Sequence, residues 1–324
     1  MTHAIRVHEA GGPEVLRWEE LAVGEPAAGE ARVRHRAVGV NFIDVYQRSG
    51  LYPVARPYTP GTEAAGVVEA VGKEVVNVRV GDRVAYATGP LGAYSEVRLV
   101  PADRLVALPS SIADDVAAAM MLKGMTAEYL TRRIVPLTAG DVALVHAAAG
   151  GVGLILCQWL AHLGVTVIGT AGSDDKAAIA RAHGAAHVIV YTREDFVARV
   201  KELTGGAGVR VVYDSVGRDT FLRSLDCIRP RGMMVSFGQS SGAIAPFDPL
   251  LLSQKGSLFL TRPTLFTYAA TRDDLVRSAT SLFEVVTRGA VKIEIGQRFA
   301  LTDAAGAHRA LESRVTHGAT VLTI

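Results

Sequence analysis

Three glycines, Gly150, Gly151 and Gly153, separate two strongly apolar runs in the stretch VALVHAAAGGVGLILC (142–157). Glycines at such a position let the backbone turn tightly and approach a pyrophosphate, whose charge then faces the first amides of the following helix. In the pattern G-x-G-x-x-G, the second and third glycines are Gly150 and Gly153, and Ala148 replaces the first. The stretch therefore predicts a dinucleotide site, and a glycine-rich packing turn is the alternative.

Together with its continuation QWLAHLG, the same stretch is apolar enough to resemble a membrane span, which needs ~20 mainly apolar residues. The glycines disfavour that interpretation, because each costs roughly 1 kcal/mol relative to alanine in a helix interior. His146, Gln158 and His162 would also be buried in lipid. A strand, a glycine turn and a buried helix are expected instead, with no membrane partner.

The residues after the next strand select the nucleotide. An NAD site usually carries an acid about 20 residues further on, at the end of the second strand, whereas residues 170–173 contain none. Ser173 can donate a hydrogen bond and Lys176 offers a positive charge, and both suit a 2′-phosphate. We therefore expect NADPH rather than NADH. Asp174 and Asp175 leave NADH open, although they also suit the first turn of a helix whose N-cap is Ser173.

From about residue 140, strand and helix patterns alternate. Strands are expected at 141–147, 165–171, 187–191, 209–215, 232–237 and 256–262, and helices at 151–164, 174–183, 194–203 and 218–228. The strands are near-continuous β-branched runs, as in a sheet that is covered on both faces. This alternation implies βαβ units, and the fold class is α/β with a Rossmann-type doubly wound parallel sheet. The glycine loop follows its first strand, where such folds bind phosphate.

Residues before about 120 have a different pattern, in which short strand candidates follow one another closely. Short strand candidates lie at 31–41, 64–72, 83–88 and 94–100, bounded by glycine and proline, and helical patterning begins at 111–133. Closely spaced short strands predict a sheet or barrel domain. The last sixty or so residues return to this mixed pattern, and we expect them to fold back onto the first domain.

Composition narrows the function classes. A chain of 324 residues suggests two domains, and a hydrophobic content of 49% is ample for two cores. The formal charge of +2 gives no reason to expect nucleic acid or an anionic membrane as a partner. Cys157 and Cys227 lie outside any CxxC pattern, so neither a disulfide framework nor a cysteine zinc site is expected. The opening MTHAIRVHEAGGPEVL has no apolar run of signal-peptide length, which predicts a cytoplasmic location.

Several segments together resemble one family across essentially the whole chain. They are GDVALVHAAAGGVGLILCQ (140–158), NFIDVYQRSGLYP (41–53), GTEAAGVVEAVG (61–72), VYDSVGRDTF (212–221) and TRPTL (261–265). They resemble the zeta-crystallin-type NADPH:quinone oxidoreductases, the zinc-free branch of the medium-chain dehydrogenase/reductase superfamily, and the bacterial ones in particular. The resemblance implies a barrel-like, mainly β, GroES-like catalytic domain over 1–121, a dinucleotide domain over 122–259, and a return segment over 260–324. Ala161 departs from the basic residue that relatives often carry.

The zinc branch of the superfamily differs at its ligands. Its members carry a catalytic cysteine where this chain has Asn41 to Asp44, and Gly-His-Glu where this chain has Gly61, Thr62 and Glu63. They often hold a four-cysteine cluster as well. With no such ligand set in the sequence, we expect no metal site and hydride transfer without zinc.

The resemblance also implies the cofactor contacts. Asn41, Phe42 and Ile43 are expected beside the nicotinamide, and Gly150 to Gly153, with Val152, around the pyrophosphate. Gly172, Ser173, Lys176 and Tyr191 are expected around the 2′-phosphate. The remaining contacts are Lys123, Thr126, Tyr129, Ser215, Phe237, Gly238, Ser240, Pro263, Thr264, Leu265 and Arg314. Lys123 and Arg314 also suit ordinary surface charges, Phe237 a core position, and Tyr191 a half-buried strand end.

The implied function is reduction of quinones by NADPH. Asn41 could hydrogen-bond a carbonyl oxygen of the substrate, and Tyr46 and Tyr52 are candidate pocket walls or proton donors. Simple stacking of the two tyrosines on a planar apolar ring is the favoured role. Reduction of enones and alkenals is an alternative activity, as is a non-catalytic NADPH-binding, structural or RNA-binding protein, although the balanced charge disfavours RNA. The resemblance and the apolar segment GSLFLT (256–261), a possible edge strand, predict a homodimer.

Overall fold

The computed structural model describes residues 1–324 and divides into two compact units. The first unit comprises Met1–Met125, Tyr268–Thr287 and Ile293–Ile324, and the second comprises Thr126–Thr267 and Arg288–Lys292. The chain passes from the first unit to the second within helix α2 (Asp114–Tyr129). None of the helices combines the length and the apolar character that a membrane crossing requires.

The second unit is built on a parallel sheet of six strands. They are β8 (Val142–Val145), β9 (Thr166–Ala171), β10 (His187–Val190), β11 (Val209–Asp214), β12 (Ile228–Ser236) and β13 (Phe259–Thr261). Their order is β10-β9-β8-β11-β12-β13, and every neighbouring pair is parallel. Because β8 lies between β9 and β11, the chain winds outward in one direction and then in the other. The predicted doubly wound parallel sheet is confirmed.

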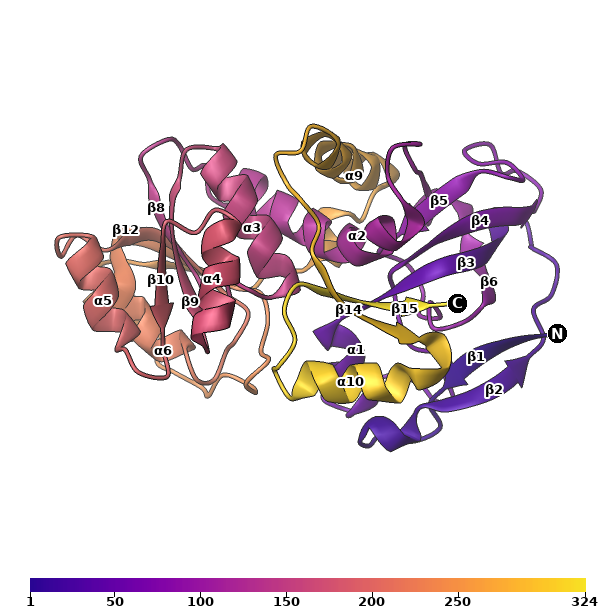
Figure 1. Ribbon diagram of the computed structural model, residues 1–324, viewed down its shortest axis with the longest axis horizontal. Coiled ribbons are helices and arrows are strands. Elements are labelled where there is room, and N and C mark those ends of the chain that lie inside the picture. The colour runs from indigo at the N-terminus through magenta and orange to yellow at the C-terminus, as the bar shows by residue number, and fades with distance from the viewer. The chain divides into compact units, whose positions relative to one another are not determined.

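Helices cover both faces of this sheet. They are α3 (Gly151–His162), α4 (Asp174–Ala182), α5 (Phe196–Leu203) and α6 (Phe221–Ser224). Two short helices flank β13 in sequence, α7 (Leu250–Gln254) before it and α8 (Leu265–Tyr268) after it. Figure 1 shows α3 and α4 on one face and α5 and α6 on the other. Apolar strand residues such as Leu144, Ile168, Ile189, Val212 and Met234 are almost fully buried in the core. Burial on both faces explains why these strands are continuous apolar runs.

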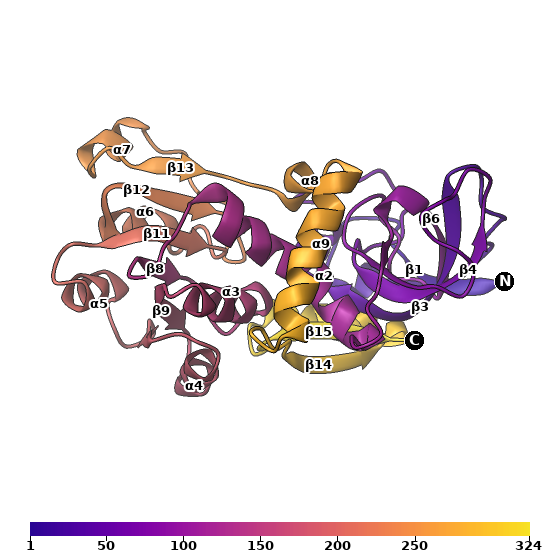
Figure 2. The same ribbon diagram turned by 90° about the horizontal axis from the view of Figure 1, so that it is seen from above.

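The first unit is mainly β. Its strands are β1 (Thr2–Arg6), β2 (Arg17–Leu21), β3 (Glu30–Val40), β4 (Ala64–Val71), β5 (Arg83–Tyr86), β6 (Val97–Pro101), β7 (Val106–Ala107), β14 (Ile295–Ala300) and β15 (Ala319–Thr323), and its helices include α1 (Phe42–Arg48), α9 (Arg272–Thr287) and α10 (Ala304–Glu312). Seven strands form one sheet in the order β14-β15-β3-β4-β5-β7, with β6 also paired to β3. The views in Figures 1 and 2 place the C-terminal strands β14 and β15 beside β3. The predicted mainly β character of this domain is confirmed.

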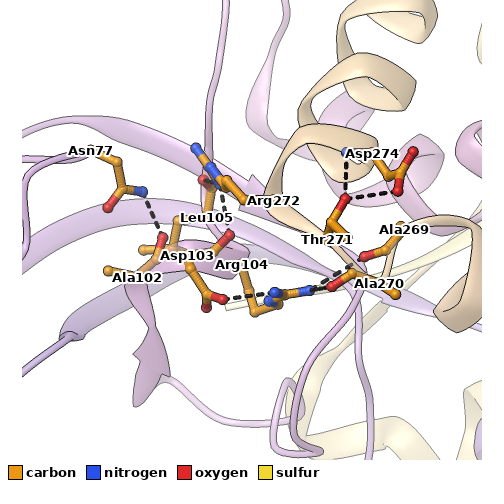
Figure 3. Close-up of polar contacts among 10 residues, drawn as sticks. All are labelled: Asn77, Ala102, Asp103, Arg104, Leu105, Ala269, Ala270, Thr271, Arg272 and Asp274. Carbon is orange, nitrogen blue, oxygen red and sulfur yellow. Dashed lines mark hydrogen bonds and ion pairs between the residues drawn. The ribbon is translucent and has the colours of Figure 1, made fainter.

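Two arginines connect the start of α9 to the turn after β6 (Figure 3). Arg104 Nη1 donates to the carbonyl oxygen of Ala270 at 3.1 Å. In the opposite direction, Arg272 Nη1 donates to the carbonyl oxygens of Asp103, at 2.8 Å, and Leu105. Each of the two segments therefore donates hydrogen bonds to carbonyl oxygens of the other. These bonds hold residues of the return segment against the N-terminal part of the same unit.

Some predicted elements are longer than the observed ones. The strand expected at 256–262 contains only Phe259–Thr261, because Gly256 and Ser257 have φ values of 106° and 56°, which an extended strand cannot accommodate. The helix expected at 218–228 is reduced to α6 and a 3-10 turn (Leu225–Cys227), because the residues before it form a loop around Asp214. The helix expected at 111–133 is α2, which ends in a π-turn (Leu130–Ile134).

The units divide at somewhat different residues from those predicted at 121 and 259. The first division falls after Met125, inside the continuous helix α2. The helical sequence pattern does not change at this point, so the sequence gives no sign of the division. The second falls after Thr267. Residues beyond 259 belong to the second unit because β13 pairs with β12, opposing Met233 to Phe259 and Val235 to Thr261.

Candidate functional site

The glycine loop lies between β8 and α3, at the carboxyl edge of the parallel sheet. Gly150 is the N-cap of α3, and Gly151 and Val152 occupy its first turn. A Cβ on Gly153 would collide with the carbonyl oxygen of Ala147 and lie 2.8 Å from that of Ala148. The loop therefore folds back closely on its own helix, and only glycine fits position 153. The first amides of a helix lack intrahelical acceptors and can bind an anion.

Ala148 replaces the first glycine of the fingerprint, and an alanine fits there because the positive φ of the loop falls on the preceding residue. The left-handed residue of the loop is Ala147, with φ of 53°. Ala148 donates its amide to the carbonyl oxygen of Thr170 on the neighbouring strand at 3.0 Å. A Cβ on Gly169 of that strand would lie 2.7 Å from the Ala148 methyl group. The absence of a side chain at Gly169 thus makes room for Ala148.

The four residues expected around a 2′-phosphate lie together after β9 and β10; we call this group the β9 corner (Gly172, Ser173, Lys176 and Tyr191). A Cβ on Gly172 would lie 2.9 Å from Tyr191 Oη, so the small residue lets the tyrosine hydroxyl approach. Ser173 is the N-cap of α4, and its Oγ accepts from the Lys176 amide at 3.3 Å. The hydroxyl hydrogen of Ser173 can still be donated to an anion. Partial burial lowers the pKa of Lys176.

The later strand ends form a second loop cluster at the same edge. Ser215 follows β11, whereas Phe237, Gly238 and Ser240 follow β12. The Ser240 amide donates to the carbonyl oxygen of Ser215 at 3.1 Å, and a Cβ on Gly238 would lie 2.7 Å from that same oxygen. Phe237 is half-buried. The two loops therefore pack backbone against backbone, which requires glycine at position 238.

The remaining predicted contacts of the second unit lie on two elements. Pro263, Thr264 and Leu265 follow β13 and lead into α8, and Thr126 and Tyr129 are buried on α2. In the first unit, Arg314 is exposed in the turn after α10, with φ of 58°. Their predicted role in binding a cofactor stays a prediction.

In the first unit, the side chain of Asn41 is held by Glu63. Asn41 Nδ2 donates to Glu63 Oε2 at 2.8 Å, and Lys123 Nζ donates to the same oxygen at 3.0 Å. Glu63 Oε1 accepts from the Leu122 amide at 2.7 Å, and the carboxylate is fully buried. A carboxylate is only an acceptor, so the amide nitrogen of Asn41 must face Glu63. One N–H of that nitrogen remains for another partner, and Lys123 is a buried counter-ion rather than a surface charge.

A buried polar chain supports α1. Tyr94 Oη lies 3.0 Å from both Asp44 Oδ2 and His308 Nε2, and Arg48 Nη1 lies 3.2 Å from His308 Nδ1. Because arginine only donates, His308 must accept at Nδ1 and donate from Nε2 to Tyr94, whose hydroxyl then donates to Asp44. Burial raises the pKa of Asp44 to about 7, and burial beside Arg48 lowers the pKa of His308 to about 3. The Asp44 carboxyl also accepts from the backbone N–H of Asn41 at 2.9 Å. This series of hydrogen bonds therefore ends at Asn41.

Aromatic rings adjoin Asn41 along the chain. The ring centroids of Phe42 and Tyr46 lie 6.1 Å apart, and those of Tyr46 and Tyr52 lie 5.2 Å apart. The Tyr52 amide donates to the carbonyl oxygen of Tyr46 at 2.9 Å, which closes the turn that follows α1. Phe42, Ile43 and both tyrosines are partly exposed. The structure thus brings the predicted aromatic wall residues together.

Two surface hollows of the first unit do not coincide with these residues. One, of about 300 Å³, lies beside Arg272 and Asn77, and another, of about 380 Å³, lies beside Arg6 and Arg98. Neither is lined by a predicted site residue. Nor does the structure group three or more His, Cys, Asp or Glu side chains so that they could hold a metal ion.

Comparison with known proteins follows the same division of the chain. The model of the alcohol dehydrogenase GroES-like domain matches residues 27–110, and the model named zinc-binding dehydrogenase matches residues 151–276. A quinone oxidoreductase of Pseudomonas aeruginosa is 54% identical over 99% of both chains. The chain belongs to the quinone oxidoreductase family. A 2-haloacrylate reductase of Burkholderia is 45% identical, again over 99% of both chains.

Solved structures of the quinone oxidoreductase family share this fold. The Escherichia coli quinone oxidoreductase, crystallised in complex with NADPH, superimposes with a TM-score of 0.98 and 49% identity, over 99% of this chain and 100% of that one. The resemblance to zeta-crystallin-type quinone oxidoreductases is therefore confirmed.

Charged residues that shape the loops of the candidate site escaped the sequence analysis. Asp214 Oδ1 accepts from the amides of Val216 and Gly217, at 2.7 and 3.1 Å, and so shapes the loop that contains Ser215. Arg262 Nη1 donates to the carbonyl oxygen of Gly238 at 2.9 Å. A charged residue at the end of a predicted strand, or just beyond it, was the available signal. The role of Glu63 had no such signal, because its partners Asn41 and Lys123 are distant in sequence.

Proposed function

We propose that this chain is an NADPH-dependent quinone oxidoreductase, which transfers a hydride or electrons from the nicotinamide to a quinone. The observation that carries the proposal is the β9 corner. There, Ser173 and Lys176 supply a hydroxyl and a charge, and the absence of a side chain at Gly172 lets the Tyr191 hydroxyl approach. The P. aeruginosa relative and the NADPH complex of the E. coli enzyme support it.

The residues of the second unit fit the adenosine and pyrophosphate portion. Gly153 lets the loop pack closely on α3, and the partly exposed Gly151 and Val152 begin that helix, whose first amides can bind a phosphate. We assign the 2′-phosphate to the β9 corner. The loops after β11 and β12, the segment after β13, and Thr126 and Tyr129 are assigned to the rest of the cofactor. We assign Asn41, Phe42 and Ile43 to its nicotinamide end, with Lys123 acting through Glu63, and keep Arg314 as a contact.

Bound NADPH would supply the hydride. The side chains of the first unit would bind and orient the acceptor. The second N–H of Asn41 Nδ2 is aimed by the first, which is bound to Glu63, and it can donate to a carbonyl oxygen. The rings of Tyr46 and Tyr52 would form one wall of a pocket for a planar apolar carbonyl compound and would exclude water.

Steady-state oxidation of NADPH with a panel of quinones tests the proposal. Purified protein should oxidise NADPH in the presence of quinones, and NADPH should be preferred to NADH. Cofactor binding without turnover on any acceptor would instead indicate a non-catalytic NADPH-binding protein.

Reduction of an activated carbon–carbon double bond is the second candidate activity. The 2-haloacrylate reductase relative, at 45% identity, favours it specifically. The same hydride delivery serves both acceptors, so the panel must include enones and 2-haloacrylates. Turnover of these compounds with a higher kcat/KM than that of any quinone would replace the proposed activity with this one.

We further propose that turnover is independent of zinc. The zinc branch carries a catalytic cysteine in the stretch where this chain has Asn41 to Asp44, and a histidine where this chain has Thr62. The Asn41 side chain is instead hydrogen-bonded to Glu63. Metal analysis should find substoichiometric zinc, and activity should survive chelators. Stoichiometric zinc that is required for activity would contradict this.

A homodimer in the cytoplasm completes the proposal. The support for a dimer is the edge position of β13, whose exposed Phe259 and Leu260 are apolar. Neither nucleic acid nor a membrane is proposed as a partner, on the grounds of the balanced charge.

A further inference from the structure

We propose that Arg193 makes the β9 corner selective for NADPH by neutralising Asp174, the acidic residue next to Ser173. The inference rests on the proposed function, because it concerns how the same cofactor site discriminates. Without a partner, a carboxylate at this position would repel a 2′-phosphate. It would also resemble the acid that NAD sites use to bind the ribose 2′-hydroxyl.

The ion pair is bidentate. Arg193 Nη1 lies 2.6 Å from Asp174 Oδ2, and Nη2 lies 2.5 Å from Oδ1. Both oxygens of the carboxylate are therefore bound by the planar fork of one guanidinium group, the most specific geometry for this pair. The side chains keep 58% and 68% of their surface exposed, so an incoming ligand can reach both.

The backbone places this pair at the proposed phosphate site. Asp174 is the first residue of α4, and Arg193 is two residues after Tyr191. The Tyr191 amide donates to the carbonyl oxygen of Ala171 at 3.1 Å, and Thr192 Oγ1 donates to that of Gly172 at 3.3 Å. These bonds join the loop after β10 to the loop after β9. Arg193 therefore lies beside Asp174 because two adjacent parallel strands end at the same edge.

The charges at the corner explain why the pair matters. The hydrogen bonds from Arg193 lower the pKa of Asp174, so the carboxylate remains ionised and its charge must be cancelled by a cation rather than by a proton. With Arg193 in place, the pair is neutral overall, so Asp174 adds no net charge to the first turn of α4, where Asp175 and Lys176 also lie. If Arg193 were removed, the corner would gain one net negative charge, and its attraction for a dianionic phosphate would fall.

Arg193 could instead bind the 2′-phosphate directly, and a double variant separates the two roles. If Arg193 acts by neutralising Asp174, removal of both side chains should return the affinity for NADPH to the wild-type value. If Arg193 binds the phosphate itself, the double variant should bind NADPH as weakly as Arg193→Ala. The four proteins of this cycle are wild type, Arg193→Ala, Asp174→Asn and Arg193→Ala/Asp174→Asn.

Fluorescence titration of NADPH and NADH at low salt is the test. The matched control is Arg229→Ala, which breaks the ion pair with Asp141 at the opposite edge of the sheet. Arg193→Ala should weaken NADPH binding by about three- to tenfold, because the negative charge of Asp174 then acts on the 2′-phosphate within about one Debye length, ~10 Å. NADH lacks this phosphate, so its binding should be equal or tighter. The double variant has the same net charge as wild type and should bind NADPH within about twofold of it, as should Arg229→Ala. Asp174→Asn leaves Arg193 unpaired and should bind NADPH at least as tightly as wild type.

Two results would overturn the inference: a double variant as weak as Arg193→Ala, or no effect of Arg193→Ala on NADPH. A wild type that binds NADH as tightly as NADPH would overturn the proposed cofactor instead. The two failures are therefore distinguishable in one set of titrations.

Discussion

Lys123 Nζ lies 3.0 Å from Glu63 Oε2, and both side chains are buried in the first unit. The same carboxylate oxygen accepts from Asn41 Nδ2. The pair thus links Lys123 of α2 to the side-chain amide of Asn41, which we propose binds the carbonyl oxygen of the substrate. It also explains why Gly39 has no side chain, because a Cβ there would collide with the Glu63 carboxylate.

Breaking this buried pair from either side should destabilise the protein. Glu63→Ala leaves the Lys123 ammonium group without its counter-ion, and Lys123→Met leaves the carboxylate without it. Each should lower the free energy of unfolding by about 3–5 kcal/mol, measured by urea denaturation. The double variant Glu63→Leu/Lys123→Met should recover part of the loss. Single variants that each cost under about 1 kcal/mol would contradict a tightly coupled pair.

His308 should make the protein sensitive to acid. Its pKa is about 3 in the folded protein and 6.5 as the ordinary value, so between these values the unfolded chain binds a proton that the folded protein excludes. Its contribution to stability therefore rises with pH through this window, by about 1.4 kcal/mol per pH unit. His308→Gln should flatten the slope of unfolding free energy against pH between about pH 4 and 6, as measured by denaturation at each pH.

Asp44 provides a comparison of opposite sign. Its pKa is raised from 3.8 to about 7, so the folded protein holds a proton that the unfolded chain has lost, and its contribution to stability falls as pH rises between these values. Asp44→Asn should therefore steepen the slope that His308→Gln flattens. Identical changes of slope in the two variants would show that these groups do not titrate as described.

Lys176 should discriminate between the two nicotinamide cofactors. A hydrogen bond to a charged group is worth ~1.5–3 kcal/mol, and every 1.4 kcal/mol is tenfold in affinity. Lys176→Ala should weaken NADPH binding by roughly tenfold or more and leave NADH nearly unchanged. Fluorescence titration measures both. Equal losses for the two cofactors would assign Lys176 a structural role in α4.

Tyr52 should affect the acceptor more than the cofactor. Its ring packs 5.2 Å from that of Tyr46, and Tyr52→Ala removes half of this wall. We expect kcat/KM for quinones to fall more than the affinity for NADPH. Tyr52→Phe is the control, because it should retain turnover if the ring acts by stacking and lose it if the hydroxyl donates a proton. Equal loss of turnover and NADPH binding in Tyr52→Ala would contradict the assignment.

The edge strand β13 should mediate self-association. Phe259 is 58% exposed there, and a charge on an edge strand opposes pairing with a second sheet. Sedimentation at micromolar concentration should show a dimer for the wild type and a shift to monomer for Phe259→Asp. A wild type that is monomeric under these conditions would refute the proposed dimer.

Local patterns were sufficient for most elements of the second unit and for the position of its glycine loop. Hydrophobic periodicity separates strands from helices, and Gly150 and Gly153 mark the turn, because each signal is contained within a few neighbouring residues. The β9 corner was also predictable, since Gly172, Ser173 and Lys176 follow one strand, and parallel strands bring their carboxyl ends to one edge.

The polar partners of the site were decided only by the tertiary structure. Glu63 meets Asn41 across 22 residues and Lys123 across 60, and Tyr94 meets His308 across 214. Arg193 reaches Asp174 across 19 residues because β9 and β10 are neighbours in the sheet. No local pattern encodes such pairs. A buried charge requires a partner, but which residue provides it depends on how distant strands are brought into register.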